Sequence, residues 1–168
     1  MNIPADRHDL YAAFGLAAEK AQVLETEAGN VALAFVTLFL KPEQITGEQR
    51  EMLRSLVDDV NRKTLGTVLK HIKDFGTFDQ TLLDTVNVAL ERRNYLMHKF
   101  FRSHNFAIHS DDGRRKMIEE LESIQKQLDL AHAMLSGITQ SLEALSGRSG
   151  MAEKLVEKLV AEGKKVEV

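Results

Sequence analysis

The chain has 168 residues, of which 43% are hydrophobic and 28% are charged, and it contains no cysteine. A chain of this length can bury one core without covalent cross-links, and this composition is typical of a folded domain rather than a disordered one. The missing cysteines exclude disulfide bonds, thiol chemistry and zinc sites built on thiolates.

We expect a soluble, cytoplasmic protein without a membrane partner. The N-terminal residues lack the basic segment and apolar core of a signal peptide. The longest apolar stretch, residues 31–40, is about half as long as a membrane-spanning helix.

Positive charge is concentrated in one segment. Residues 91–116 contain seven lysines and arginines against three acids, whereas the whole chain has a formal net charge of -3. A basic region on an acidic body can bind a polyanion such as RNA at one place. A solvated helix end with its loop would give the same charge pattern.

The first predicted helix covers residues 9–40, where apolar side chains recur at helical spacing. It ends before Pro42 because proline disfavours helical geometry in the preceding residue. The second covers residues 46–76, beginning with Thr46-Gly47-Glu48-Gln49, which resembles a capping box, and ending at Gly76.

The third predicted helix covers residues 78–104, and the fourth begins after Asp111-Asp112-Gly113 and ends at Ser146-Gly147. Four long helices with short connections favour an all-α fold, an antiparallel up-down four-helix bundle over residues 1–146. Residues 147–168 are predicted to be a linker and a short amphipathic C-terminal helix, which docks on the bundle or on a partner, or frays.

The third predicted helix has two distinct faces when successive residues are placed about 100° apart. One face is apolar and contains Leu82, Val86, Ala89, Leu96, Met97 and Phe100. The opposite face is a polar stripe of Asn87, Glu91, Asn94, His98 and Arg102. Arg93 falls within the apolar face, where a charged group is costly unless it has a partner.

Arg93 and His98 are the side chains of this helix that suggest chemistry. The guanidinium group of Arg93 suits a phosphate or a carboxylate, so Arg93 either binds a ligand or forms a structural ion pair. His98 follows Asn94 by one helical turn, so the amide can orient an imidazole that exchanges protons near neutral pH. The alternative for His98 is an inert surface histidine.

The pattern Arg93-Asn94-x-x-x-His98 resembles the arginine–histidine motif of the HEPN superfamily, including the polar residue after the arginine. The resemblance covers the motif and, loosely, the helical bundle around it. It implies a metal-independent endoribonuclease that works as a homodimer, among toxins of toxin–antitoxin pairs and other defence effectors. Arg93 would then bind the scissile phosphate, His98 would be the general base or acid, and Asn94 would orient one of them.

RNA carries its own nucleophile, the 2′-hydroxyl group, so a proton shuttle and a cation suffice for cleavage to a cyclic phosphate without a cofactor. One difficulty is that Arg93 and His98 point about 140° apart on an ideal helix. A symmetric dimer, in which His98 of one chain approaches Arg93 of the other, would remove this difficulty. A local bulge in the helix would also help.

Other residues near the motif are candidates for RNA binding. Arg102 and Lys99 can contact the RNA backbone, although a solvated helix end is the alternative. Tyr95, Phe100 and Phe101 can stack on a base or pack in the core or at a dimer interface.

No metal is expected, because His104 and His109 lack the spacing and the carboxylate partner of a metal site. The HEPN resemblance implies three partners: RNA if the site is catalytic, a second copy of the chain, and a cognate antitoxin protein if the chain is a toxin. One alternative function is a non-catalytic HEPN-like module for dimerisation or regulation, in which Arg93 forms a structural ion pair. A weaker one is a lipid- or peptide-binding bundle whose first helix lines an open cavity.

Overall fold

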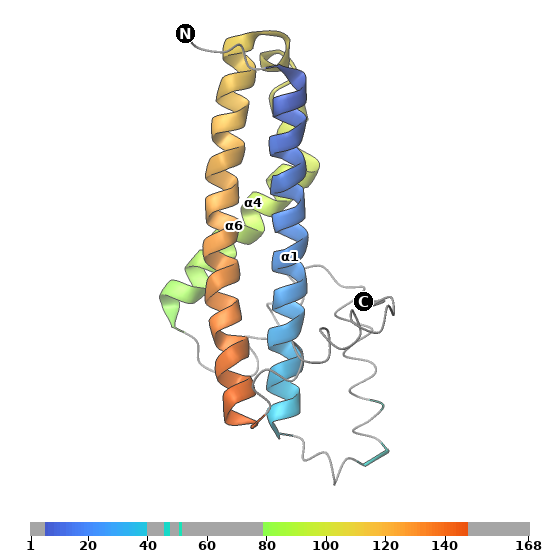
Figure 1. Ribbon diagram of the computed structural model, residues 1–168, viewed down its shortest axis with the longest axis vertical. Coiled ribbons are helices and arrows are strands. Elements are labelled where there is room, and N and C mark those ends of the chain that lie inside the picture. Colours follow the sequence, from blue (N-terminus) through green and yellow to red (C-terminus); the bar gives the residue numbers. More distant parts are fainter. Residues whose placement is uncertain (1–5, 40–45, 48–50, 52–78, 148–168) are drawn as a thin grey trace, which may run out of the picture.

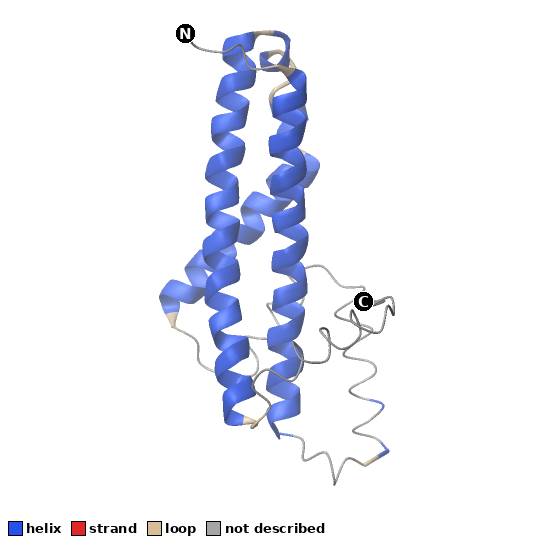
Figure 2. Cartoon of the chain, in the orientation of Figure 1, coloured by secondary structure: helices blue, strands red, loops and turns tan. Residues whose placement is uncertain are grey.

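The computed structural model describes residues 6–39, 46, 47, 51 and 79–147. Figure 2 shows helices and no strand in this part of the chain, so the predicted all-α class is confirmed. Nearly all of the predicted second helix, and the predicted C-terminal segment beyond residue 147, lie outside the described residues.

The helices are α1 (Arg7–Phe39), α4 (Gln80–His98), α5 (Phe100–Ser103) and α6 (Asp111–Leu145), with a short 3₁₀ turn, η2 (Ala107–His109), before α6. Within the described ranges, none of these helices has an apolar stretch long enough to cross a membrane.

Two long helices, α1 and α6, lie side by side and form most of the core (Figure 1). Their buried residues recur at intervals of three and four, with one step of seven at the start of α1: Leu10, Ala17, Ala21, Leu24, Ala28 and Val31 in α1, and Met117, Leu121, Ile124, Leu128, Ala131 and Leu135 in α6. This repeat is that of a coiled-coil seam, in which the apolar row of one helix packs against the row of the other.

The helices α1 and α6 run parallel. Near their N-terminal ends, Gln125 Nε2 donates a hydrogen bond to the Ala13 carbonyl oxygen at 3.0 Å. Further along both helices, Thr139 Oγ1 donates to Glu27 Oε1 at 2.7 Å. The two helices therefore begin at the same end of the molecule, as Figure 1 shows.

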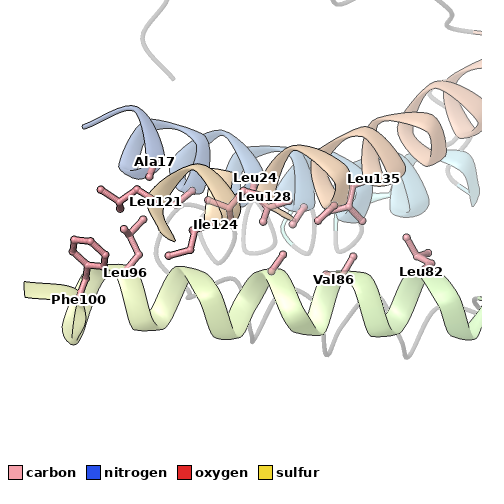
Figure 3. Close-up of a cluster of buried hydrophobic side chains, with 14 of the residues drawn as sticks. Ala17, Leu24, Leu82, Val86, Leu96, Phe100, Leu121, Ile124, Leu128 and Leu135 are labelled. Atoms are coloured by element: carbon pink, nitrogen blue, oxygen red, sulfur yellow. The ribbon is translucent and has the colours of Figure 1, made fainter. Parts of the chain in front are cut away.

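Helix α4 crosses this pair obliquely and buries one face against both helices (Figure 1). Figure 3 shows the side chains that point from α4 and α5 toward α1 and α6, among them Leu82, Val86, Leu96 and Phe100. Phe100 contacts Phe14 near the start of α1, whereas Arg93 contacts Glu25 further along. Helix α4 therefore runs antiparallel to α1.

The order of helix directions differs from the predicted up-down alternation. In an alternating bundle the first and third helices are parallel, whereas α4, the predicted third helix, is antiparallel to α1. The short connection between α4 and α6 makes these two helices antiparallel, and the apolar seam aligns α6 with α1. The four-helix arrangement is not confirmed within the described residues.

The start of α6 differs from the prediction by one turn. The Ser110 hydroxyl accepts a hydrogen bond from the Gly113 backbone N–H at 3.1 Å, so the helix begins at Asp111 and the predicted loop is its first turn. Gly113 is buried there, and a Cβ at this position would clash with the Ala107 carbonyl oxygen. Sequence rules associate a glycine at this position with a turn. In the structure, Gly113 lies inside a helix, and glycine is required there because η2 approaches too closely for a side chain.

Candidate functional site

The two predicted faces of α4 are present in the structure. The inward face is buried at Leu82, Val86, Ala89 and Leu96, whereas the stripe of Asn87, Glu91, Asn94, His98 and Arg102 is exposed. Met97 is the exception, because it was predicted on the apolar face and is 44% exposed. The polar stripe is therefore an outer surface of the described chain.

Arg93 lies at the edge of the buried face and has an acidic partner. Its side chain is 19% exposed, and its Nη2 lies 2.5 Å from Oε1 of Glu25 in α1, whose side chain is 30% exposed. The Glu25 oxygen is enclosed, yet no donor among the described residues is aligned to form a hydrogen bond with it. The contact is thus an electrostatic pair, as expected for an arginine that cannot be left unpaired in an apolar face.

Asn94 contacts Arg93 rather than His98. The Arg93 Nη1 donates a hydrogen bond to Asn94 Oδ1 at 3.0 Å. Asn94 was predicted to orient either Arg93 or His98, and in the structure it contacts Arg93.

His98 is exposed and is the last residue of α4. The backbone is interrupted only after it, at Lys99 (φ -128°, ψ -25°), and α5 follows at once. Because α4 is regular from Gln80 to His98, no bulge turns His98 toward Arg93 in the same chain. The structure therefore does not bring these two predicted site residues together within one chain.

Fewer cations of the predicted basic region are available to a ligand than the sequence suggested. Arg114 is paired with Asp111, and both Arg115 and Lys116 are paired with Asp112 in the first turns of α6. The remaining cations are Arg92, Lys99 and Arg102, all exposed on α4, α5 and the residue between them, and no described carboxylate lies within ion-pair distance of them. Positive charge is thus available beside His98 but not along the whole segment.

Tyr95 belongs to a cluster that the sequence analysis did not identify. Nε2 of His104 lies 2.7 Å from Glu120 Oε2 in α6 and 3.3 Å from the Tyr95 hydroxyl oxygen in α4. Because an ionised carboxylate only accepts hydrogen bonds, Nε2 carries the proton that is donated to Glu120. The His104 ring also packs against Phe100, with ring centroids 4.9 Å apart.

The cluster of Tyr95, His104 and Glu120 joins three parts of the fold: α4, the turn after α5, and α6. Burial raises the pKa of Tyr95, and so do a hydrogen bond to Glu120 and the negative charge of that carboxylate. No sequence signal relates His104 to Glu120, because 16 residues separate them and the separation crosses a turn. Tyr95 is therefore held inside the chain and is not presented as a free stacking surface.

No group of three or more His, Asp or Glu side chains that could hold a metal ion occurs in the part of the chain that the structure describes. Comparisons with family models, curated proteins and solved structures find no match to this chain.

Proposed function

We propose that this chain is a metal-independent endoribonuclease of the HEPN type that acts as a homodimer. The proposal rests on one observation: Asn94 accepts a hydrogen bond from Arg93, and Asn94 and His98 both lie on the exposed stripe of α4. A positioned guanidinium group and an accessible imidazole are the two groups that RNA needs for cleavage by its own 2′-hydroxyl.

In this proposal, Arg93 binds the scissile phosphate and Asn94 orients the guanidinium group. His98 of a second chain transfers protons to or from the 2′-hydroxyl and the leaving oxygen, because the regular helix points His98 of the same chain away. Lys99 and Arg102, which are exposed beside His98, bind neighbouring phosphates. Tyr95 supports the corner of α4 and α5 through His104 and does not stack on a base.

A ribonuclease of this kind would act in the cytoplasm as a toxin or defence effector and would be held inactive by a cognate antitoxin protein. The predicted helix over residues 46–76 would complete a four-helix bundle with the described helices.

The direct test is RNA cleavage by the purified full-length protein in the presence of EDTA. We expect the wild type to cut mixed cellular RNA and to leave 2′,3′-cyclic phosphate ends, whereas His98→Ala and Arg93→Ala variants do not cut. Circular dichroism and sedimentation must show that both variants remain folded and keep the oligomeric state of the wild type. Equal background cleavage in all three proteins would contradict the proposal.

A second candidate function is supported by the ion pair between Arg93 and Glu25. A structural arginine in an apolar face would make this contact, as expected for a non-catalytic HEPN-like module for dimerisation or regulation. In that case the RNA assay stays at background, and the oligomeric state no longer depends on the exposed stripe of α4.

The lipid- or peptide-binding alternative receives no support from α1. Its apolar face packs against α6 and α4, and the groove on its other side contains the ion pair of Lys20 with Asp129.

A further inference from the structure

We infer that Glu25 acts as an internal lock on Arg93, occupying the position that an RNA phosphate takes when the substrate binds. This inference rests on the proposed ribonuclease function and adds a means of regulating its site. It concerns a residue of α1 that lies far from the motif in the sequence.

The contact itself suggests this role. A guanidinium group binds carboxylates and phosphates through the same fork of N–H groups, so a carboxylate on Arg93 competes directly with a phosphate. Glu25 Oε1 lies 2.5 Å from Nη2 of Arg93, so the carboxylate already occupies the side of the guanidinium group that faces α1. A phosphate that approached Arg93 while Glu25 stayed in place would also meet the repulsion of a like charge.

The two terminal nitrogens of Arg93 differ in their partners. The enclosed Glu25 oxygen has no aligned hydrogen-bond donor among the described residues, although it lies so close to Arg93. Nη1 of Arg93, in contrast, makes an aligned hydrogen bond to Asn94. A phosphate, with more oxygens in a tetrahedral arrangement, can accept hydrogen bonds from Nη2 and from another N–H group of the same guanidinium fork.

Release of the lock needs only a side-chain movement. The neighbouring Leu24 is fully buried in the seam with α6, so the α1 backbone is fixed at this point. Glu25 is 30% exposed and Arg93 is 19% exposed, so part of each side chain reaches solvent, although the paired Oε1 is enclosed. Rotation about the Glu25 side-chain bonds would move its carboxylate into water and free Arg93 without any change in helix packing.

The test measures binding of a fluorescent, uncleavable 2′-O-methyl oligoribonucleotide to the full-length protein by anisotropy in EDTA. We expect Glu25→Gln to bind about fivefold more tightly than the wild type, the upper end of the effect of a partly exposed ion pair. Glu25→Asp, which keeps the charge but withdraws it by one methylene group, should give a smaller gain.

Glu19→Gln is the matched control. Glu19 is exposed on the same helix and lines the groove with Lys20 and Asp129, on the far side from α4. Its replacement by glutamine removes the same negative charge as Glu25→Gln. We expect its affinity to stay close to that of the wild type. The gain in RNA affinity from Glu25→Gln should also disappear in the double variant with Arg93→Ala, because Glu25 then has no guanidinium group to compete for.

Equal affinities for Glu25→Gln and Glu19→Gln, together with weaker binding by Arg93→Ala, would overturn the lock and leave the ribonuclease proposal in place. Binding by Glu25→Gln but not by the wild type would support the lock in its strongest form. Absence of both binding and cleavage in every protein would overturn the proposed function and the lock with it.

Discussion

Two polar clusters on opposite sides of α4 differ in construction, although their α4 residues, Arg93 and Tyr95, are only two positions apart. On the side of α1, Arg93 meets Glu25 through charge without an aligned hydrogen bond. On the side of α6, Tyr95, His104 and Glu120 meet in a closed network beside Phe100. The first arrangement can exchange its anion for another, whereas the second one fixes three segments of the chain.

The largest expected effects distinguish two histidines that lie six residues apart. His98→Ala should lower the rate of RNA cleavage by about 10²–10⁴-fold, the usual contribution of a general acid or base. Because His98 is exposed, its replacement should change the free energy of unfolding by no more than about 0.5 kcal/mol.

His104→Ala should have the opposite result. It removes the donor to Glu120, so we expect a loss of about 1–3 kcal/mol in the free energy of unfolding with cleavage retained in the folded protein. Urea unfolding and a cleavage assay on each variant check both expectations. An inactive but fully stable His104→Ala variant would show that the two histidines have been assigned the wrong roles.

Phe100 links α1 to the Tyr95 cluster, because its ring packs against Phe14 of α1 as well as against Tyr95 and His104. It is 1% exposed, and Phe100→Ala should lower the free energy of unfolding by about 3–5 kcal/mol. Phe106 is the control residue, because it is 85% exposed and its replacement by alanine should cost less than about 0.5 kcal/mol. Thermal unfolding followed by circular dichroism measures both variants, and similar melting temperatures would contradict the described packing.

Glu120→Gln should lower the free energy of unfolding by roughly 1–2 kcal/mol, because the neutral amide is a weaker acceptor for the His104 Nε2–H group. Glu122→Gln, an exposed position on the same helix, provides the control for the loss of one charge. Denaturant unfolding of the two variants measures the difference. Equal stability would mean that the Tyr95 cluster does not hold α4 to α6.

The smallest expected effect appears at alkaline pH. Burial and Glu120 raise the pKa of Tyr95 in the folded protein above its ordinary value of 10.0. The stability that this shift provides is therefore fully present below the pKa of the unfolded chain and is lost as the pH rises through the folded value. Tyr95→Phe should flatten this alkaline decline, which unfolding experiments from neutral pH to above pH 10.0 can measure. An unchanged decline would assign it to other groups.

Helical periodicity predicted much of the fold. The buried rows of α1 and α6 and the two faces of α4 follow from the spacing of apolar residues. The end of α6 near Gly147 follows from the glycine-containing linker after it. Periodicity contains no information on which helices are neighbours, so the parallel arrangement of α1 and α6 was not predicted. Met97 was misplaced because a helical wheel does not specify how wide the buried face is.

The site was only partly predictable for a related reason. An arginine in an apolar face indicated a partner, but nothing in the sequence identified Glu25 among the other acids of α1. The Tyr95 cluster depends on a turn that brings His104 to α6, and turns of this kind leave no periodic signal. The run of cations at the start of α6 suggested a basic surface, but acids in the same helical turn pair with them.

The most direct test of the two-chain site is complementation between inactive variants. If Arg93 of one chain works with His98 of the other, a mixed dimer of Arg93→Ala and His98→Ala chains contains one site with both residues intact. Random mixing of equal amounts should then restore about a quarter of the wild-type activity, since about half of the dimers are mixed and each has one working site. Restored cleavage of this size, with neither variant active alone, is the predicted result. A mixture as inactive as its components, despite proven exchange of chains, would contradict a site shared between two copies of α4.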